Sequence, residues 1–186
     1  MKLVIAMTGA SGAIYTQRML ANLDPAFYEV HFIATQHARE VAQIELPKGD
    51  LIVRPEVTQY DESGSMFVPF VSGSAKFDAM VIIPASMGTV GRIAHGFSDN
   101  TVARAADVFL KERRQLILVP REAPYNLIHL RNMVTLTEAG ATIIPASPSF
   151  YSKPKSIDEL VDTIIARVLD HLGIEHHLGK RWQSAE

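Results

Sequence analysis

Residues 1–23 read MKLVIAMTGASGAIYTQRMLANL, and the order of residue types in this stretch already indicates how the chain folds. An apolar run at residues 3–7 is followed by the turn TGASGA, and a helical pattern covers residues 12–23. Glycine permits backbone angles that are closed to other residues, and the free N–H groups at the start of a helix attract anions. The turn therefore predicts a ligand site, although its spacing matches neither G-x-G-x-x-G nor G-x-x-x-x-G-K-[ST].

The same alternation of apolar run and helical pattern continues along the chain. Further apolar runs occupy residues 30–35, 79–85, 115–120 and 141–146, and further helical patterns occupy residues 36–45, 99–113 and 156–173. Continuous apolar runs are typical of strands buried on both faces, and strands that alternate with helices form parallel sheets. The sequence predicts an α/β protein with a doubly wound, mainly parallel sheet between two helical layers.

Length and composition limit the classes of protein that remain. The chain has 186 residues, a net charge of −2 and no cysteine, and its first apolar run is too short for a signal peptide or a membrane span. Disulfides, cysteine-bound zinc and thiol catalysis are excluded, the histidines lack metal-ligand spacing, and no basic excess favours nucleic acid or membrane binding. We expect a cytoplasmic enzyme or binding protein without a bound metal.

The domain organisation is expected to be simple. Residues 1–186 are interpreted as one domain, with an irregular excursion at residues 47–77 that could contain a short hairpin, and with a C-terminal tail at residues 173–186. The excursion holds most of the turn residues of the chain, and its composition does not resemble that of a linker.

Ligands of such sheets bind beyond the carboxyl ends of the strands, near the point where the strand order reverses. The turn TGASGA and the turn PASMGT, with Ser86, Gly88 and Thr89, both follow apolar runs and could donate hydrogen bonds to one ligand. Local packing and helix capping by Ser86 are alternative explanations. Thr35 stands where an NAD site would have an acidic residue, which favours a mononucleotide over NAD.

Several charged side chains have both a functional and a structural interpretation. Arg104 and Lys111 are seven residues apart and share a helix face, but Asp107 is spaced to pair with both. Arg167 lies at the margin of the apolar stripe of the last helix, where arginines often cover the core. Arg121 and Glu122 directly follow a buried strand and are expected to point into the ligand crevice.

Five stretches give the chain a marked resemblance to a known family. They are MTGASGAIY, PASMGT, DNTVARAADVFLKERRQLILVPREAPYNLIHLRNM, GATIIPASPSFYSKPKSIDELVDTIIARVLDHLGI and the terminal pair Arg181-Trp182. Nearly end to end, the chain resembles the flavin prenyltransferase family, UbiX and its relatives.

The resemblance implies a fold, a reaction and partners. It implies a flavodoxin-like or Rossmann-like subunit that binds FMN and assembles into a homo-dodecamer. The reaction would join the dimethylallyl group of dimethylallyl monophosphate to N5 and C6 of reduced FMN without a metal, and the prenylated FMN would serve a UbiD-type decarboxylase. An FMN-dependent cysteine decarboxylase of the phosphopantothenoylcysteine type and a non-catalytic flavin-binding protein are the alternatives.

The resemblance also implies roles for individual residues. The FMN-binding residues would be Gly9, Ala10, Ser11, Thr35, Ser86, Met87, Gly88, Thr89 and Arg121. The prenyl-phosphate site would contain Arg104, Lys111, Arg121, Glu122, Tyr151 and Arg167, some of them from neighbouring subunits. Ser11, Glu45 and Glu122 would be catalytic, with Glu45 transferring a proton on the flavin side and Glu122 acting on the phosphate side. Arginine and lysine suit the departing phosphate because they stabilise its charge.

Overall fold

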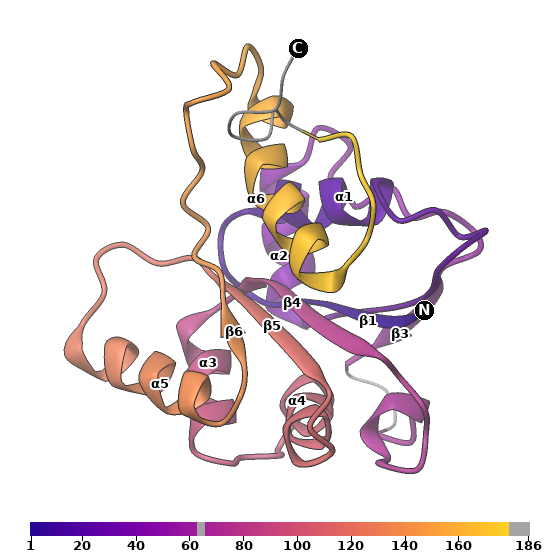
Figure 1. Cartoon of the computed structure of the whole chain (residues 1–186), viewed down its shortest axis with the longest axis vertical. Coiled ribbons are helices and arrows are strands. Elements are labelled where there is room, and N and C mark those ends of the chain that lie inside the picture. Colours follow the sequence, from indigo (N-terminus) through magenta and orange to yellow (C-terminus); the bar gives the residue numbers. More distant parts are fainter. Residues whose placement is uncertain (63–65, 179–186) are drawn as a thin grey trace.

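The computed structural model describes residues 1–62 and 66–178 (Figure 1). The strands of this part of the chain are β1 (Lys2–Met7), β2 (Glu29–Ala34), β3 (Thr58–Asp61), β4 (Ala79–Ala85), β5 (Gln115–Pro120) and β6 (Thr142–Ile143). Its α-helices are α1 (Ala13–Ala21), α2 (Gln36–Glu45), α3 (Met87–Ala94), α4 (Thr101–Lys111), α5 (Leu127–Glu138) and α6 (Ile157–Leu172), and a short 3-10 helix covers Pro69–Val71.

The strands form a single parallel sheet in the order β3-β2-β1-β4-β5-β6. Without the short edge strand β3, the order is the one typical of flavodoxin-like folds. The chain winds outward in one direction from β1 and in the other from β4, so the strand order reverses between these two neighbours. The predicted doubly wound architecture is confirmed.

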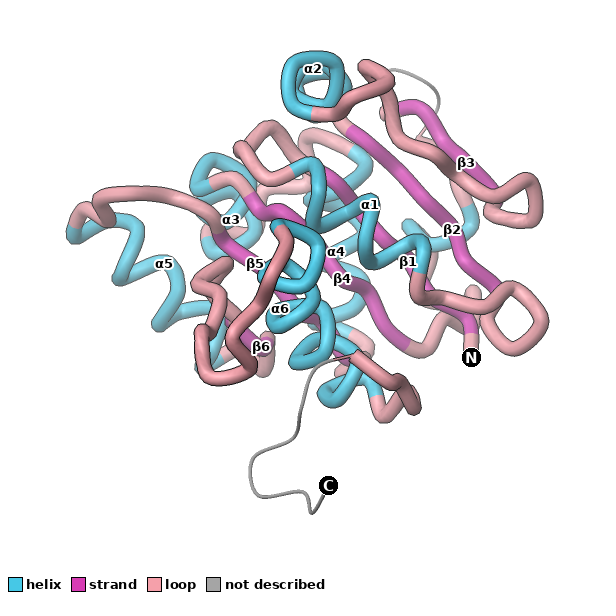
Figure 2. The backbone as a smooth tube through the Cα atoms, turned by 90° about the horizontal axis from the view of Figure 1, so that it is seen from above, coloured by secondary structure: helices cyan, strands magenta, loops and turns pink. Residues whose placement is uncertain are grey.

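Helices cover both faces of the sheet, as Figures 1 and 2 show. The first core contains α1, α2 and α6 and receives alternate side chains of β1, such as Ile5, whereas the second contains α3, α4 and α5 and receives Val4 and Ala6. Alternate side chains of a strand point to opposite faces, so a strand between two helical layers must be apolar throughout. This requirement explains the continuous apolar runs.

The excursion at residues 47–77 differs from the expected hairpin. In its described part the only strand is β3, and β3 pairs in parallel with β2 rather than with a second strand of the excursion. The segment Thr58–Asp61 is polar and largely exposed, so it forms an edge strand that an apolar pattern does not reveal. The described part of the excursion therefore contains no hairpin.

Polar caps begin several of the helices. Thr35, Ser86 and Asn100 each accept a hydrogen bond from a backbone N–H in the first turn of the helix that follows them. Helix α6 ends at Gly173, whose φ of 70° is left-handed, as the sequence predicts. The terminal pair Arg181-Trp182 lies outside the described residues.

Candidate functional site

The two glycine- or serine-bearing turns meet where the strand order reverses. Thr8, which directly follows β1, is 1% exposed and links the turns. Its hydroxyl donates to the carbonyl of Pro84 (2.9 Å) and accepts from the N–H of Ser86 (2.7 Å). Thr8 begins the predicted ligand turn TGASGA but has no individual predicted role, and it fixes the turn after β1 against the turn after β4.

A carboxylate occupies the start of α1. Glu45, the last residue of α2, accepts hydrogen bonds from the N–H groups of Gly12 and Ala13, both at 2.8 Å. Burial acts to raise the pKa of Glu45, but hydrogen bonds from the Ser11 hydroxyl and these two N–H groups, together with the charge of Arg121, lower it overall. An ionised carboxylate thus lies beside Ser11. It already accepts hydrogen bonds from backbone N–H groups that could otherwise donate to a phosphate.

The amino ends of two other helices, capped by Thr35 and Ser86, lie at a cavity of about 280 Å³ beside these turns. The residues that line it are Thr8, Gly9, Thr35, His37, Glu62, Ser86, Thr89, Arg92 and Asn100. Helix α2 starts after Thr35 and α3 after Ser86, so both helix N-termini favour an anion here. The hydroxyls of Thr35, Ser86 and Thr89 add further hydrogen-bonding groups.

Four of the predicted FMN residues line this cavity, namely Gly9, Thr35, Ser86 and Thr89. Thr8 and His37 also line it and lie in stretches directly after predicted strands, whereas sequence reasoning missed Glu62, Arg92 and Asn100. Asn100 had a recognisable signal, because asparagine before a helical pattern predicts a cap, whereas Arg92 lies inside a helix that the apolar pattern did not reveal. Of the remaining predicted FMN residues, Ala10 and Met87 are buried and Gly88 is exposed at the start of α3.

Arg121 connects the start of α1 with the end of β5. Its N–H donates to the carbonyl of Ala85 (3.2 Å), and its guanidinium influences both Glu45 and Tyr15 electrostatically. Burial raises the pKa of Tyr15, and the charge of Arg121 opposes that rise. The neighbouring Glu122 accepts a hydrogen bond from the N–H of Ala123 (3.0 Å). The structure therefore brings Arg121, Ser11 and Glu45 into one region.

Two residues predicted for the prenyl phosphate lie on α4. Arg104 pairs with Asp107 at 3.0 Å, and Lys111 pairs with Glu112. Helix α4 begins at the cavity, where Asn100 lies, and its last residue is Lys111. An α-helix rises about 1.5 Å per residue, so Lys111 lies roughly 16 Å along the helix from the cavity. The structure does not bring Lys111 together with the predicted FMN residues.

Arg167 and Tyr151 also lie apart from the cavity. Arg167 is exposed on α6 and pairs with Asp170 at 3.1 Å. The amide of Gln115, the first residue of β5, donates to the carbonyl of His171, so this part of α6 lies at the amino edge of the sheet, opposite the cavity. Tyr151 is 82% exposed, on the loop between β6 and α6 that extends beyond the sheet in Figure 1.

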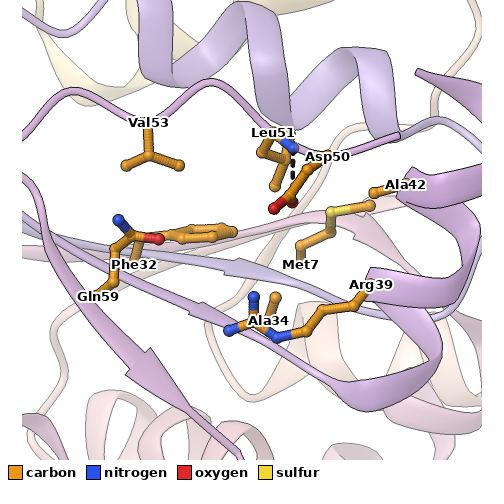
Figure 3. A pocket seen from close by; sticks show the side chains of 9 residues that line it. All are labelled: Met7, Phe32, Ala34, Arg39, Ala42, Asp50, Leu51, Val53 and Gln59. Carbon is orange, nitrogen blue, oxygen red and sulfur yellow. Dashed lines mark hydrogen bonds between the residues drawn. The ribbon is translucent and has the colours of Figure 1, made fainter. Parts of the chain in front are cut away.

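A second cavity, of about 170 Å³, lies between α2, the loop at residues 50–53 and strands β1–β3. Its lining residues are Met7, Phe32, Ala34, Arg39, Ala42, Asp50, Leu51, Val53 and Gln59. In Figure 3 the carboxylate of Asp50 accepts from the N–H of Leu51, and the side chain of Arg39 extends from α2 past Ala34. Its described lining contains none of the predicted site residues, which separates this cavity from the site above.

The fold and the polar cavity at the strand reversal define a flavoprotein subunit. The chain belongs to the Flavoprotein family, whose sequence model matches residues 1–169. Within it the chain belongs with the flavin prenyltransferases of the UbiX type. It is 44% identical to "Flavin prenyltransferase UbiX" of Methanocaldococcus jannaschii over 182 residues, which cover 98% of each chain.

Solved structures agree with this assignment. AnUbiX (PadA1), crystallised in complex with FMN and dimethylallyl pyrophosphate, matches with a TM-score of 0.91 and 39% identity over 100% of this chain and 98% of its own. A dodecameric FMN-dependent UbiX-like decarboxylase from Escherichia coli O157:H7 matches with a TM-score of 0.89 and 37% identity over 99% of this chain and all of its own. A mutant PPC decarboxylase, at 21% identity and a TM-score of 0.69 over 92% of this chain and 98% of its own, shares the fold alone.

No helix in the described part of the chain is long and apolar enough to cross a membrane.

Proposed function

We propose that this chain is a flavin prenyltransferase, which transfers a dimethylallyl group from dimethylallyl monophosphate to N5 and C6 of reduced FMN. The observation that carries the proposal is the polar cavity at which α2 and α3 begin, together with the adjoining Ser11–Glu45 turn. The cavity suits the phosphate of FMN. The turn suits the flavin ring, because it offers a hydroxyl and an ionised carboxylate next to Arg121.

The phosphate of FMN fits the cavity on chemical grounds. Two helix N-termini, the hydroxyls of Thr35, Ser86 and Thr89 and the guanidinium of Arg92 surround it. Hydrogen bonds to a charged acceptor contribute about 1.5–3 kcal/mol each, more than those to a neutral one. The Glu45 carboxylate holds the first N–H groups of α1, so the phosphate is directed to α2 and α3 instead.

Reduced FMN, when bound, supplies the electron-rich ring that accepts the prenyl group. Arg104, Lys111, Arg121 and Arg167 would stabilise the departing phosphate, with Tyr151 completing that site. Because Lys111 and Arg167 lie toward the opposite edge of the sheet, a neighbouring copy must contribute them. We therefore infer a homo-oligomer, a dodecamer like the Escherichia coli relative, in which each site is shared between chains.

The two glutamates would divide the proton transfers. Glu45 is ionised at neutral pH, because its pKa is lowered, and it can accept a proton on the flavin side beside the Ser11 hydroxyl. Glu122, next to Arg121, would act on the phosphate side. General bases contribute about 10²- to 10⁴-fold to a rate, so Glu45→Gln should slow formation of prenylated FMN by at least that lower factor. A wild-type rate in this variant would contradict the role given to Glu45.

One assay tests the function as a whole. The protein is incubated anaerobically with reduced FMN and dimethylallyl monophosphate, and the extracted flavin is weighed by mass spectrometry. We expect a flavin heavier by one C5H8 unit, with release of inorganic phosphate. An unmodified flavin, recovered from protein that had bound FMN, would overturn the proposal. An unmodified flavin alone would favour a non-catalytic flavin-binding protein. If the same preparation also released CO₂ from a peptidyl or pantothenoyl cysteine, a cysteine decarboxylase would be favoured.

Three wider expectations accompany this function. The prenylated FMN would pass to a UbiD-type decarboxylase, residues 1–186 would form one flavoprotein domain, and the protein would work in the cytoplasm. The first can be tested by adding the extracted flavin to a flavin-free UbiD-type enzyme and measuring the return of decarboxylation.

A further inference from the structure

Glu62 lines the cavity that we assign to the phosphate of FMN, although an ionised carboxylate repels a phosphate. Its Oε1 atom is shielded from solvent and has no hydrogen-bond partner among the described residues. A buried polar atom normally has a partner, and leaving one unsatisfied is unfavourable. A carboxyl in this position needs a donor, or must itself become one by taking up a proton.

The charged groups around Glu62 do not compensate for an ionised carboxylate. Arg92 from α3 and His37 from α2 face it on one side, and Asp61 of β3 and Asp99 before α4 act on it as like charges. Arg92 is already shared, since its guanidinium pairs with Asp99 at 3.3 Å. Burial raises the pKa of Glu62, and the charges of Asp61 and Asp99 add to that rise against Arg92 and His37.

We propose that Glu62 must be protonated when the cavity receives the phosphate of FMN, so that FMN binding takes up one proton from solvent at any pH at which Glu62 of the free protein is ionised. The neutral carboxyl then donates its O–H to a phosphate oxygen, whereas the carboxylate excludes the phosphate by repulsion. Glu62 is thus a specificity-determining residue that distinguishes FMN from riboflavin, which lacks the phosphate. This inference rests on the proposed function only for the placement of the phosphate.

The dissociation constants of FMN and riboflavin, measured from pH 6 to 9 by the quenching of flavin fluorescence, test the proposal. With the wild-type protein the dissociation constant of FMN should rise about tenfold per pH unit above the pKa of Glu62, relative to Glu62→Gln. The comparison with Glu62→Gln removes the contribution of the phosphate group, which has its own ionisation near pH 6. Riboflavin binding should be the same in both proteins at every pH.

Calorimetry counts the proton directly. When FMN is titrated in two buffers of different ionisation enthalpy, at a pH above the pKa of Glu62 in the free protein, the wild-type protein should take up about one proton more per site than Glu62→Gln. Glu56→Gln, which removes an exposed carboxylate away from the cavity, is the matched control and should behave as wild type. His37→Asn tests the other titratable group and should retain the uptake.

Two results would overturn the proposal: equal proton uptake in wild type and Glu62→Gln, or loss of the uptake in His37→Asn alone. Neither would affect the proposed function, because FMN would still bind and be prenylated. If Thr89→Val and Glu62→Gln both left FMN binding unchanged at every pH, the phosphate would not occupy this cavity. That outcome would overturn the placement of FMN as well.

Discussion

The carboxyl edge of the sheet and the outer faces of α4 and α6 differ in how far a single chain brings their polar groups together. At the carboxyl edge, turns distant in sequence converge, and Thr8 joins the ends of β1 and β4 through a buried hydroxyl. On α4 and α6 the basic side chains instead pair with acids of their own helix or its end, as in Arg104–Asp107 and Arg167–Asp170. The site that we propose for the flavin is thus preformed in the single chain, and the one that we propose for the prenyl phosphate is not.

This difference shows which residues the fold alone can bring together. The strand reversal between β1 and β4 is a property of the chain topology, so any copy that folds contains the cavity. Exposed ion pairs contribute little stability, about 0–1 kcal/mol, and exchange readily for a better anion. In the shared site that we propose, the basic residues of α4 and α6 would therefore exchange these pairs for the phosphate at small cost when a second chain presents its flavin site.

Mixing two inactive variants tests this comparison most strongly. Lys111→Ala lacks part of the phosphate site and Glu45→Gln lacks the flavin-side carboxylate. If each site combines two chains, mixed oligomers of equal composition regain about a quarter of wild-type prenylation, because a quarter of the sites receive two intact halves. The rate of prenylated FMN formation is measured after dissociation and reassembly of the mixture.

The control for this experiment is a mixture of either variant with itself, which should stay at background. No recovery in the heterologous mixture, with mixed oligomers demonstrated by native mass spectrometry, would place both halves of the site in one chain.

The sequence predicted the strands well and the distant contacts poorly. Apolar runs located β1, β2, β4 and β5 to within about a residue, because strands buried on both faces leave a continuous pattern. The run at 141–146 yields a β6 of only two residues, although the N–H groups of Ile144 and Ala146 still donate to the carbonyls of Leu118 and Pro120 beside it.

Helices α3 and α5 were not predicted. Two glycines interrupt the pattern of α3, and exposed apolar residues such as Leu127 and Ile128 obscure the buried face of α5. The resemblance supplied the site residues. It could not supply Glu62 or Arg92, whose positions depend on the irregular excursion and on a helix that was not recognised.

Arg167→Ala and Thr89→Val should separate the two regions. Loss of the Arg167 guanidinium should lower kcat/KM for the prenyl phosphate about 10- to 100-fold and leave FMN binding unchanged, because a hydrogen bond from a charged donor contributes about 1.5–3 kcal/mol. Thr89→Val should weaken FMN binding about tenfold through the lost hydroxyl. Steady-state kinetics and fluorescence titration measure the two effects.

Arg54→Ala removes an exposed arginine that donates to the carbonyl of Ala21, and serves as the control for Arg167→Ala. If Arg167→Ala weakened FMN binding more than use of the prenyl phosphate, the division between the two regions would be incorrect.

Gly9→Ala should damage the flavin site specifically. A Cβ atom at Gly9 would lie 2.6 Å from the Cβ of His37, so the turn after β1 and the start of α2 must move apart. We expect the dissociation constant of FMN to rise about tenfold, since the helix N-terminus loses its alignment with the phosphate. Gly88→Ala meets its nearest neighbour, Arg92, at 3.5 Å and should bind FMN almost as wild type does. Equal effects of the two substitutions would contradict a close approach at Gly9.

Glu45→Ala should produce the smallest effect, on stability. The carboxylate caps α1, and such a cap contributes about 1 kcal/mol to the free energy of unfolding. Because the pKa of Glu45 is lowered in the folded state, this contribution is fully present above its unfolded pKa and is lost as the pH falls through its folded pKa. Urea unfolding should show wild type and variant differing at pH 7 and converging under acid. Glu40→Ala, on the same helix, should show no such convergence.

The short outer strands determine how copies of this chain can meet. In the described part of the chain, strand β3 has four residues and ends in the charged Asp61, and β6 has two, so each described outer strand offers only a short length of backbone for another chain to extend. The association that we propose would use side-chain surfaces instead, such as the exposed Leu127, Ile128 and Val134 of α5. Each chain can therefore complete its sheet before it meets another, and dilution and reconcentration should dissolve and rebuild the assembly without unfolding its members.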